Sequence, residues 1–230
     1  MSRRVSERVR LALRQPDKIA PALLRRALGR RTWIAQGDYV TFDLHGFVSA
    51  PSPPLLLARH HYETGCIRRV LGDRRVGDSL EVGCGFGRLT PLLASYSDHH
   101  EAVDINEQAL AMARTCYPDL RFSLGSATSL PFQDDGFDLV STWTVLQHIR
   151  PQLIEKAVTE IQRVRRPDGL LLLCEATRFP GGAGDGIWDR HRRFYEEAFS
   201  PLRLAEATYI AELDRIPGLA TPGEVMLFVP

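Results

Sequence analysis

Apolar runs and amphipathic segments alternate along the chain from about residue 78 onward. Residues 78–84 form a short apolar run that ends in glycines, and residues 170–174 are apolar without interruption. An uninterrupted run of this length is typical of a strand that is covered on both faces of a parallel sheet. Between these runs, residues 151–165 carry apolar side chains at the spacing of a helix. This alternation of strands and helices predicts a doubly wound α/β fold.

The C-terminal segments follow a different pattern. Residues 202–213 and 225–229 are both strand-like, and a turn-rich stretch with two prolines and two glycines joins them. Two such strands predict an antiparallel hairpin at one side of the sheet. The sequence as a whole predicts a seven-stranded, mostly parallel sheet. Besides the segments already named, the predicted fold contains strands at 101–105, 120–124 and 137–142 and helices at 88–97 and 107–117.

The first 77 residues differ from the rest of the chain. A proline-rich break at 50–54 separates an N-terminal helical extension from the part that leads into the sheet. The sequence therefore predicts a basic arm or cap over residues 1–54 and an α/β domain over residues 55–230. The elements expected before the sheet are basic helices at 5–13 and 20–28, a partly extended segment at 33–48, and a helix at 55–71.

Positive charge is concentrated in the arm. Residues 1–31 hold ten Arg or Lys against two acids, a net charge of +8, whereas the remaining residues carry a net charge of −7. The arm is therefore a separate electrostatic unit, suited to RNA phosphates or to an anionic membrane surface. Because the body is acidic, nucleic acid is not the partner that we expect.

Several classes of protein are excluded by features that the sequence lacks. It has no run of about 18 apolar residues for a membrane-spanning helix, and its N-terminus lacks the apolar core of a signal peptide. The four cysteines show no CxxC spacing. Two histidine pairs, at 60–61 and 99–100, consist of adjacent residues, which rarely chelate one ion. We therefore expect a cytoplasmic protein without a metal site.

A glycine-rich loop follows the first predicted strand. Gly83, Gly85 and Gly87 form a G-x-G-x-G pattern. Glycines let the backbone turn sharply and let a ligand approach, and the next helix directs its unpaired N–H groups at that ligand. Asp104 follows Gly83 by 21 residues, at the end of the second predicted strand. A carboxylate there accepts hydrogen bonds from the ribose hydroxyls of a nucleoside cofactor.

Two features argue against a nicotinamide cofactor. The dinucleotide fingerprint is G-x-G-x-x-G, which has one more residue before its third glycine. Glu81 also precedes the loop, and its carboxylate would sit poorly beside a pyrophosphate. A carboxylate suits a ligand with an ammonium group, such as methionine has.

Together these residues resemble motif I of the class I S-adenosylmethionine-dependent methyltransferases of the small-molecule type, and the resemblance extends over residues 55–230. Residues 102–106 are similar to the family's ribose-binding motif, 125–127 to its adenine-binding segment, and 163–170 to its turn before strand five. The resemblance implies S-adenosylmethionine as the cofactor. The cofactor-binding residues that it implies are Arg59, Tyr62, Glu81, Gly83, Cys84, Gly85, Gly87, Asp104, Ile105, Ser126, Ala127, Thr142 and Trp143.

The adenine-binding segment departs from the family pattern at Ser126, where an aspartate is usual. A serine hydroxyl binds an adenine amino group less strongly than a carboxylate does. We therefore expect weaker cofactor binding, unless Thr128 shares the role.

Candidate catalytic residues follow the fourth and fifth predicted strands. His148 lies in a loop at the carboxyl end of the sheet, and a histidine there is suited to act as a general base near neutral pH. Its alternative role is structural, at the start of the next helix. His191 belongs to an arginine-rich cluster at 187–195, which is either an acceptor lid that binds a carboxylate or phosphate, or a solvated helix start. His148 and His191 are thus the catalytic candidates, and the acceptor-binding candidates are Gln147, Arg192 and Tyr195.

The leading hypothesis is therefore a small-molecule O- or N-methyltransferase. Its acceptor is a natural-product, sugar or envelope-glycan intermediate. The alternatives are an RNA methyltransferase that uses the arginine-rich arm and a non-catalytic partner protein that retains the fold. The sequence leaves the assembly open, and both a homodimer and weak contact of the arm with a membrane surface are compatible with it.

Overall fold

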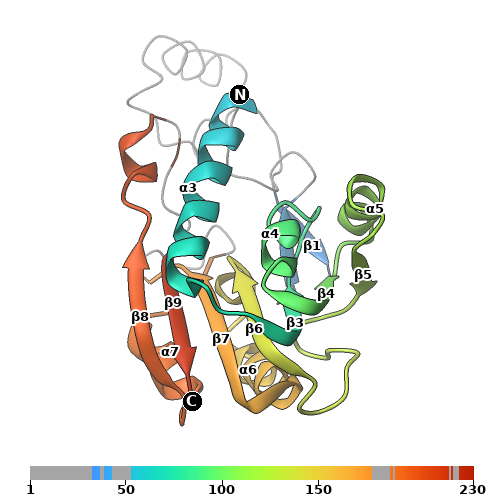
Figure 1. Ribbon diagram of the computed structural model, residues 1–230, viewed down its shortest axis with the longest axis vertical. Coiled ribbons are helices and arrows are strands. Elements are labelled where there is room, and N and C mark those ends of the chain that lie inside the picture. The colour runs from blue at the N-terminus through green and yellow to red at the C-terminus, as the bar shows by residue number, and fades with distance from the viewer. Residues whose placement is uncertain are drawn as a thin grey trace, which may run out of the picture.

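A seven-stranded sheet forms the centre of the molecule (Figure 1). The computed structural model describes residues 33–36, 39–42, 53–177, 187–188, 190–217, 219 and 223–230. The strand order is β5-β4-β3-β6-β7-β9-β8. The strands are β3 (Val76–Val82), β4 (Ser97–Asp104), β5 (Arg121–Leu124), β6 (Phe137–Trp143), β7 (Arg165–Glu175), β8 (Arg203–Tyr209) and β9 (Glu224–Val229).

Six of these seven strands run in the same direction, and β9 runs antiparallel to both of its neighbours, β7 and β8. The predicted doubly wound sheet with an antiparallel C-terminal hairpin is therefore confirmed. From β3 the chain adds β4 and β5 on one side and then returns to form β6 on the other side of β3. This reversal creates a crevice beyond the carboxyl ends of β3 and β6, which is where open α/β sheets bind ligands.

Helices cover both faces of the sheet, with α3 and α4 on one face and α6 and α7 on the other (Figure 1). The side chains of β7 explain its uninterrupted apolar sequence. Leu171 and Leu173 lie in the core beneath α6, whereas Leu172 between them lies in the core beneath α3. The helices are α3 (Pro53–Leu71), α4 (Thr90–Ala94), α5 (Glu107–Cys116), α6 (Ile154–Val164) and α7 (Arg192–Ala198).

The N-terminal arm is described in part. β1 (Trp33–Gln36) and β2 (Tyr39–Phe42) form a two-stranded antiparallel sheet. β2 lies against η2 (Leu146–His148), a short 3₁₀ helix that follows β6. The helices predicted at 5–13 and 20–28 lie outside the described residues. Among the residues described, none of the helices combines the length and the apolar character that crossing a membrane requires.

Two strands begin at least four residues earlier than the sequence predicted. β4 starts at Ser97 and β7 at Arg165, four and five residues before the expected positions. Both extensions are polar, so hydrophobicity gave no signal for them. Their buried side chains form hydrogen bonds instead of apolar contacts: His100 Nδ1 lies 2.7 Å from Ser79 Oγ, and Arg165 Nη1 donates to nearby backbone carbonyls. The helix predicted at 88–97 is correspondingly short.

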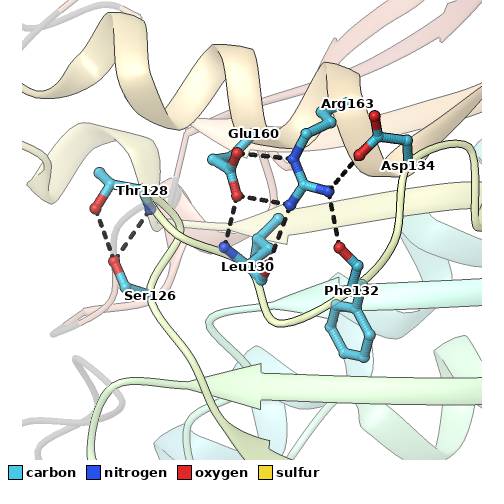
Figure 2. Close-up of polar contacts among 7 residues, drawn as sticks. All are labelled: Ser126, Thr128, Leu130, Phe132, Asp134, Glu160 and Arg163. Carbon is cyan, nitrogen blue, oxygen red and sulfur yellow. Dashed lines mark hydrogen bonds and ion pairs between the residues drawn. The ribbon is translucent and has the colours of Figure 1, made fainter.

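The loop between β5 and β6 is held in place by two side chains of α6 (Figure 2). Arg163 donates to the carbonyls of Phe132 and Leu130 at 2.7 and 3.1 Å and to the carboxylate of Asp134 at 2.8 Å. It also pairs with both oxygens of Glu160 at 2.8 Å, and Glu160 accepts the N–H of Leu130. Arg163 keeps the pKa of Glu160 below its usual value. This network fixes the chain just before β6.

Arg163→Lys is expected to lower the free energy of unfolding by about 1–3 kcal/mol, because an ammonium group cannot supply the five directed donors of a guanidinium. Denaturant unfolding followed by circular dichroism measures the change. Arg75→Lys is the matched control: its ion pair with Asp98 is exposed on both sides, so a change within about 0.5 kcal/mol is expected. Equal losses in the two variants would contradict a structural role for the network.

Candidate active site

A cleft opens beyond the carboxyl ends of β3 and β6. Its walls come from the loop after β3, the end of β4, the segment after β5, and the loop from β6 to η2. Eight of the thirteen residues predicted to bind the cofactor line it: Glu81, Gly83, Cys84, Gly85, Asp104, Ile105, Ala127 and Trp143.

The glycine loop turns the chain sharply at this cleft. Gly83 and Gly85 have φ angles of +79° and +58°, in the left-handed region that glycine adopts without strain. A Cβ on Gly83 would lie 2.2 Å from Cγ2 of Val145, so only glycine fits at this position. The N–H groups of Gly83 and Cys84 both donate to the carbonyl of Val103, at 2.7 and 3.0 Å. The loop is thus fixed between β4 and the loop after β6.

Asp104 ends β4 and directs its carboxylate at the glycine loop. Oδ2 accepts the N–H of Gly85 and Oδ1 accepts the N–H of Asn106, both at 2.8 Å. Burial raises the pKa of Asp104 above its ordinary value, although these hydrogen bonds act in the opposite direction. Because each carboxylate oxygen has more than one lone pair, Asp104 can hold the loop and accept hydrogen bonds from two ligand hydroxyls.

Glu81 is a buried carboxylate on the cleft wall, at the end of β3. The hydroxyl of Thr90 donates to its Oε2 at 2.5 Å. His100 Nε2 lies 3.9 Å from the same oxygen, and the other ring nitrogen is held by Ser79 on β3. These contacts from two elements fix the direction of the Glu81 side chain, which places an acidic group at this wall.

The predicted residues of α3 do not line the cleft. Arg59 is buried and donates to Glu63 Oε1 at 2.9 Å, while Tyr62 packs on the core behind it. The other oxygen of Glu63 pairs with Arg88. Arg88 does line the cleft, and its buried Nη1 has no hydrogen-bond partner among the described residues. Neither Glu63 nor Arg88 was predicted, although Arg88 directly follows the glycine loop in the sequence.

Two further predicted residues lie behind the cleft wall. Gly87 packs so closely on neighbouring aromatic side chains that a Cβ would lie 3.0 Å from the nearest ring atom. The hydroxyl of Ser126 accepts the N–H of Thr128 at 3.1 Å and lies 2.9 Å from its hydroxyl, which closes a turn (Figure 2). The backbone on either side of Ser126, at Gly125 and Ala127, lines the cleft instead.

The loop after β6 is built around a buried carboxylate that the sequence did not predict. Glu175 ends β7, has no solvent exposure, and accepts the hydroxyl of Thr142 at 2.8 Å. It also accepts the backbone N–H groups of residues 145–147 at 3.0–3.1 Å, which are unpaired donors at the start of η2. Burial raises the pKa of Glu175 despite these bonds. They fix the part of the cleft wall that contains Trp143 and His148.

Arg190 holds the opposite end of η2. Its guanidinium is buried and donates to the carbonyl of Leu146 at 2.7 Å and to that of Ile149 at 2.5 Å. The backbone N–H of Trp188 also donates to the loop, at 2.8 Å. The segment before α7 is therefore docked on the loop that carries His148.

The predicted catalytic and acceptor-binding residues do not lie together. Of these five residues, His148 lines the cleft. Gln147 is buried, and its side chain accepts a hydrogen bond from the backbone that follows β7. Tyr195 has no solvent exposure and lies in the core. His191 and Arg192 line a second cavity, at the start of α7.

Glu175→Gln is expected to lower the free energy of unfolding by about 2–4 kcal/mol. The amide nitrogen of glutamine cannot accept a hydrogen bond, so buried N–H groups of the loop lose their partner. Denaturant unfolding measures the loss, and hydrogen exchange at residues 145–147 locates it. Glu155→Gln, on the exposed side of α6, is the control and should change stability by less than about 0.5 kcal/mol. A Glu175 variant as stable as the parent would contradict this role.

Comparison with known proteins shows a similarity to methyltransferases. Residues 80–173 match the family model described as "Methyltransferase domain". Over 107 residues the chain is 34% identical to a Mycobacterium tuberculosis protein named "Probable S-adenosylmethionine-dependent methyltransferase", an alignment that covers 46% of this chain and 38% of that protein. The chain spans less than half the length of the curated relatives that it matches.

Solved structures share the fold at lower identity. The YcgJ protein of Bacillus subtilis superposes with a TM-score of 0.59 at 18% identity, covering 74% of this chain and 97% of that one. Phosphoethanolamine N-methyltransferase 1 of Haemonchus contortus, in complex with phosphoethanolamine and S-adenosylhomocysteine, gives a TM-score of 0.68 at 15% identity, covering 81% of this chain and 45% of that one. Residues 80–173 of this chain are therefore similar in sequence to S-adenosylmethionine-dependent methyltransferases, and the α/β domain shares the fold of a solved methyltransferase.

Proposed function

We propose that this chain transfers a methyl group from S-adenosylmethionine to an oxygen or nitrogen atom of a small-molecule acceptor. The observation that carries the proposal is the hydrogen bond from Gly85 to Asp104 inside the cleft, at 2.8 Å. It brings a glycine-rich backbone and a ribose-binding carboxylate together at one site. S-adenosylmethionine bound there supplies an electrophilic methyl group on a sulfonium.

The two sides of the cleft fit different parts of the cofactor. Asp104 would accept hydrogen bonds from the ribose, with the adenine beside Gly125 and Ala127. Near the loop after β3, Glu81 offers a carboxylate to the methionine ammonium group. Arg88 offers its buried Nη1 to the methionine carboxylate. An unpaired buried guanidinium nitrogen is unfavourable, so an anionic ligand group would stabilise it.

The protein's own contribution to methyl transfer is alignment, exclusion of water and acceptance of a proton. Trp143 and Ile149 give the cleft apolar walls. His148 lines the same cleft, and its backbone N–H donates to the carbonyl of Val145 at 2.9 Å, which fixes it in η2. We assign the general base to His148. His191 is assigned to acceptor contact because it belongs to the second cavity.

Two observations favour a small-molecule acceptor. The N-terminal arm reaches the loop that carries His148, since β2 lies against η2, and we propose that residues 1–54 act as a cap over the acceptor. The Haemonchus contortus neighbour, which shares this fold, is a methyltransferase of the small molecule phosphoethanolamine and was solved with S-adenosylhomocysteine.

Asp104→Ala is expected to weaken S-adenosylhomocysteine binding by at least roughly 100-fold, because hydrogen bonds to a charged group contribute about 1.5–3 kcal/mol each. Isothermal titration calorimetry on the full chain measures the affinity, and circular dichroism verifies the fold. The same change at an exposed residue of β7, Asp168→Ala, is the control and should leave the affinity unchanged. Equal affinity of the Asp104 variant and the parent would refute the cofactor assignment.

The affinity for S-adenosylhomocysteine should also fall as the pH is lowered. Asp104 must be ionised to accept hydrogen bonds from both ribose hydroxyls, and burial raises its pKa above the ordinary value of 3.8. The loss of affinity therefore begins at a higher pH than for an exposed aspartate. Calorimetry from about pH 8 to about pH 5 measures the slope. Asp104→Asn cannot titrate and should bind weakly with little slope; a slope as steep as that of the parent would assign the effect to another group.

A further inference from the structure

The second cavity lies at the carboxyl edge of the sheet, beside the first cleft. It is formed by Thr177 after β7, Tyr209 at the end of β8, Glu224 at the start of β9, and His191 and Arg192 at the start of α7. In the sheet, β7 pairs with β6 on one side and with β9 on the other. Because neighbouring strands are about 4.8 Å apart, the cavity is roughly 10 Å from the β6 wall of the first cleft.

Glu224 is the centre of a hydrogen-bond network in this cavity. Its side chain is 4% exposed, and its Oε1 accepts Nη1 of Arg192 at 3.0 Å. Its Oε2 contacts the hydroxyls of Thr177 and Tyr209 at 2.8 and 3.1 Å, and the two hydroxyl oxygens are 2.5 Å apart. A buried carboxylate is tolerated only where donors surround it in this way. The network therefore holds one carboxylate and two hydroxyls in fixed positions on the cavity wall.

The positive charges around the cavity are compensated, which differs from the anion-binding cluster that the sequence suggested. Arg192 pairs with both Glu224 and Glu196. Arg193 pairs with a glutamate one turn further along α7. The third arginine of the cluster, Arg190, is buried and donates to the carbonyls of η2. A phosphate or carboxylate ligand would have to compete with carboxylates that are already in place.

We propose that the second cavity binds an uncharged, hydroxyl-rich part of the methyl acceptor, of the sugar or polyol class. This rests on the proposed function, because it treats the cavity as the acceptor side of the same active site. Sugar hydroxyls both donate and accept hydrogen bonds, which matches a wall made of a carboxylate, two hydroxyls, a guanidinium and the imidazole of His191. The lining contains two arginines and two glutamates, so its formal charges cancel and it offers no net attraction to an ionic ligand.

The test is saturation-transfer NMR on the full chain in the presence of saturating S-adenosylhomocysteine. The neutral probes are methyl α-D-glucopyranoside, methyl α-D-mannopyranoside and myo-inositol; the charged probes are glucose 6-phosphate and glucuronate. At least one neutral probe is expected to bind, and more tightly than either charged probe. Tyr209→Phe and Thr177→Val each remove one hydroxyl and should weaken that binding roughly three- to tenfold. Thr159→Val, on the exposed face of α6, is the control and should not change it.

Calorimetry with S-adenosylhomocysteine separates this proposal from the proposed function. Both variants should bind it as the parent does, because Thr177 and Tyr209 do not line the first cleft. If none of the neutral probes binds, if a charged probe binds more tightly, or if both variants bind the sugar like the parent, the acceptor proposal is overturned while the cofactor site stands. Failure of the parent itself to bind S-adenosylhomocysteine would overturn both.

Discussion

The buried carboxylate of Glu175 is the interaction on which the architecture of the active site depends. A carboxylate in the interior is unfavourable unless donors surround it, and here the donors are the hydroxyl of Thr142 and three backbone N–H groups of residues 145–147. The end of β7 is thereby joined to the loop after β6. Val145 in that loop occupies the space beside Gly83, so the position of the loop also dictates a glycine at the turn after β3.

The end of β7 also connects the first cleft with the second cavity. Glu224, at the centre of the second cavity, pairs in register with Glu175, and Thr177 follows two residues later. From the other side, Arg190 holds the carbonyl end of η2 and precedes the first turn of α7, which lines the second cavity. The general base that we assign, His148, therefore lies in a loop that is fixed at both ends. An acceptor bound in the second cavity would therefore approach His148 along a loop that has little freedom to move.

The sequence predicted those features that local pattern or fixed spacing determines. Apolar periodicity identified the seven strands, and the spacing of the glycine loop and Asp104 identified two parts of the cleft that are in fact hydrogen-bonded. It did not predict features that depend on partners far apart in the chain. The polar start of β4 is stabilised by the contact of His100 with Ser79, and Glu175 takes its donors from another strand. Likewise, Arg59 was predicted at the cofactor, but its pairing with Glu63 keeps it out of the cleft, and Arg88 lies there instead.

The proposed function requires that the cleft beyond the carboxyl ends of β3 and β6 bind S-adenosylmethionine with its ribose on Asp104. A crystal structure of the full chain with S-adenosylhomocysteine tests it most directly. We expect both ribose hydroxyls within about 3.2 Å of the Asp104 carboxylate and the methionine carboxylate on Arg88. A ligand bound at another face of the sheet, or a ribose directed away from Asp104, would contradict the claim.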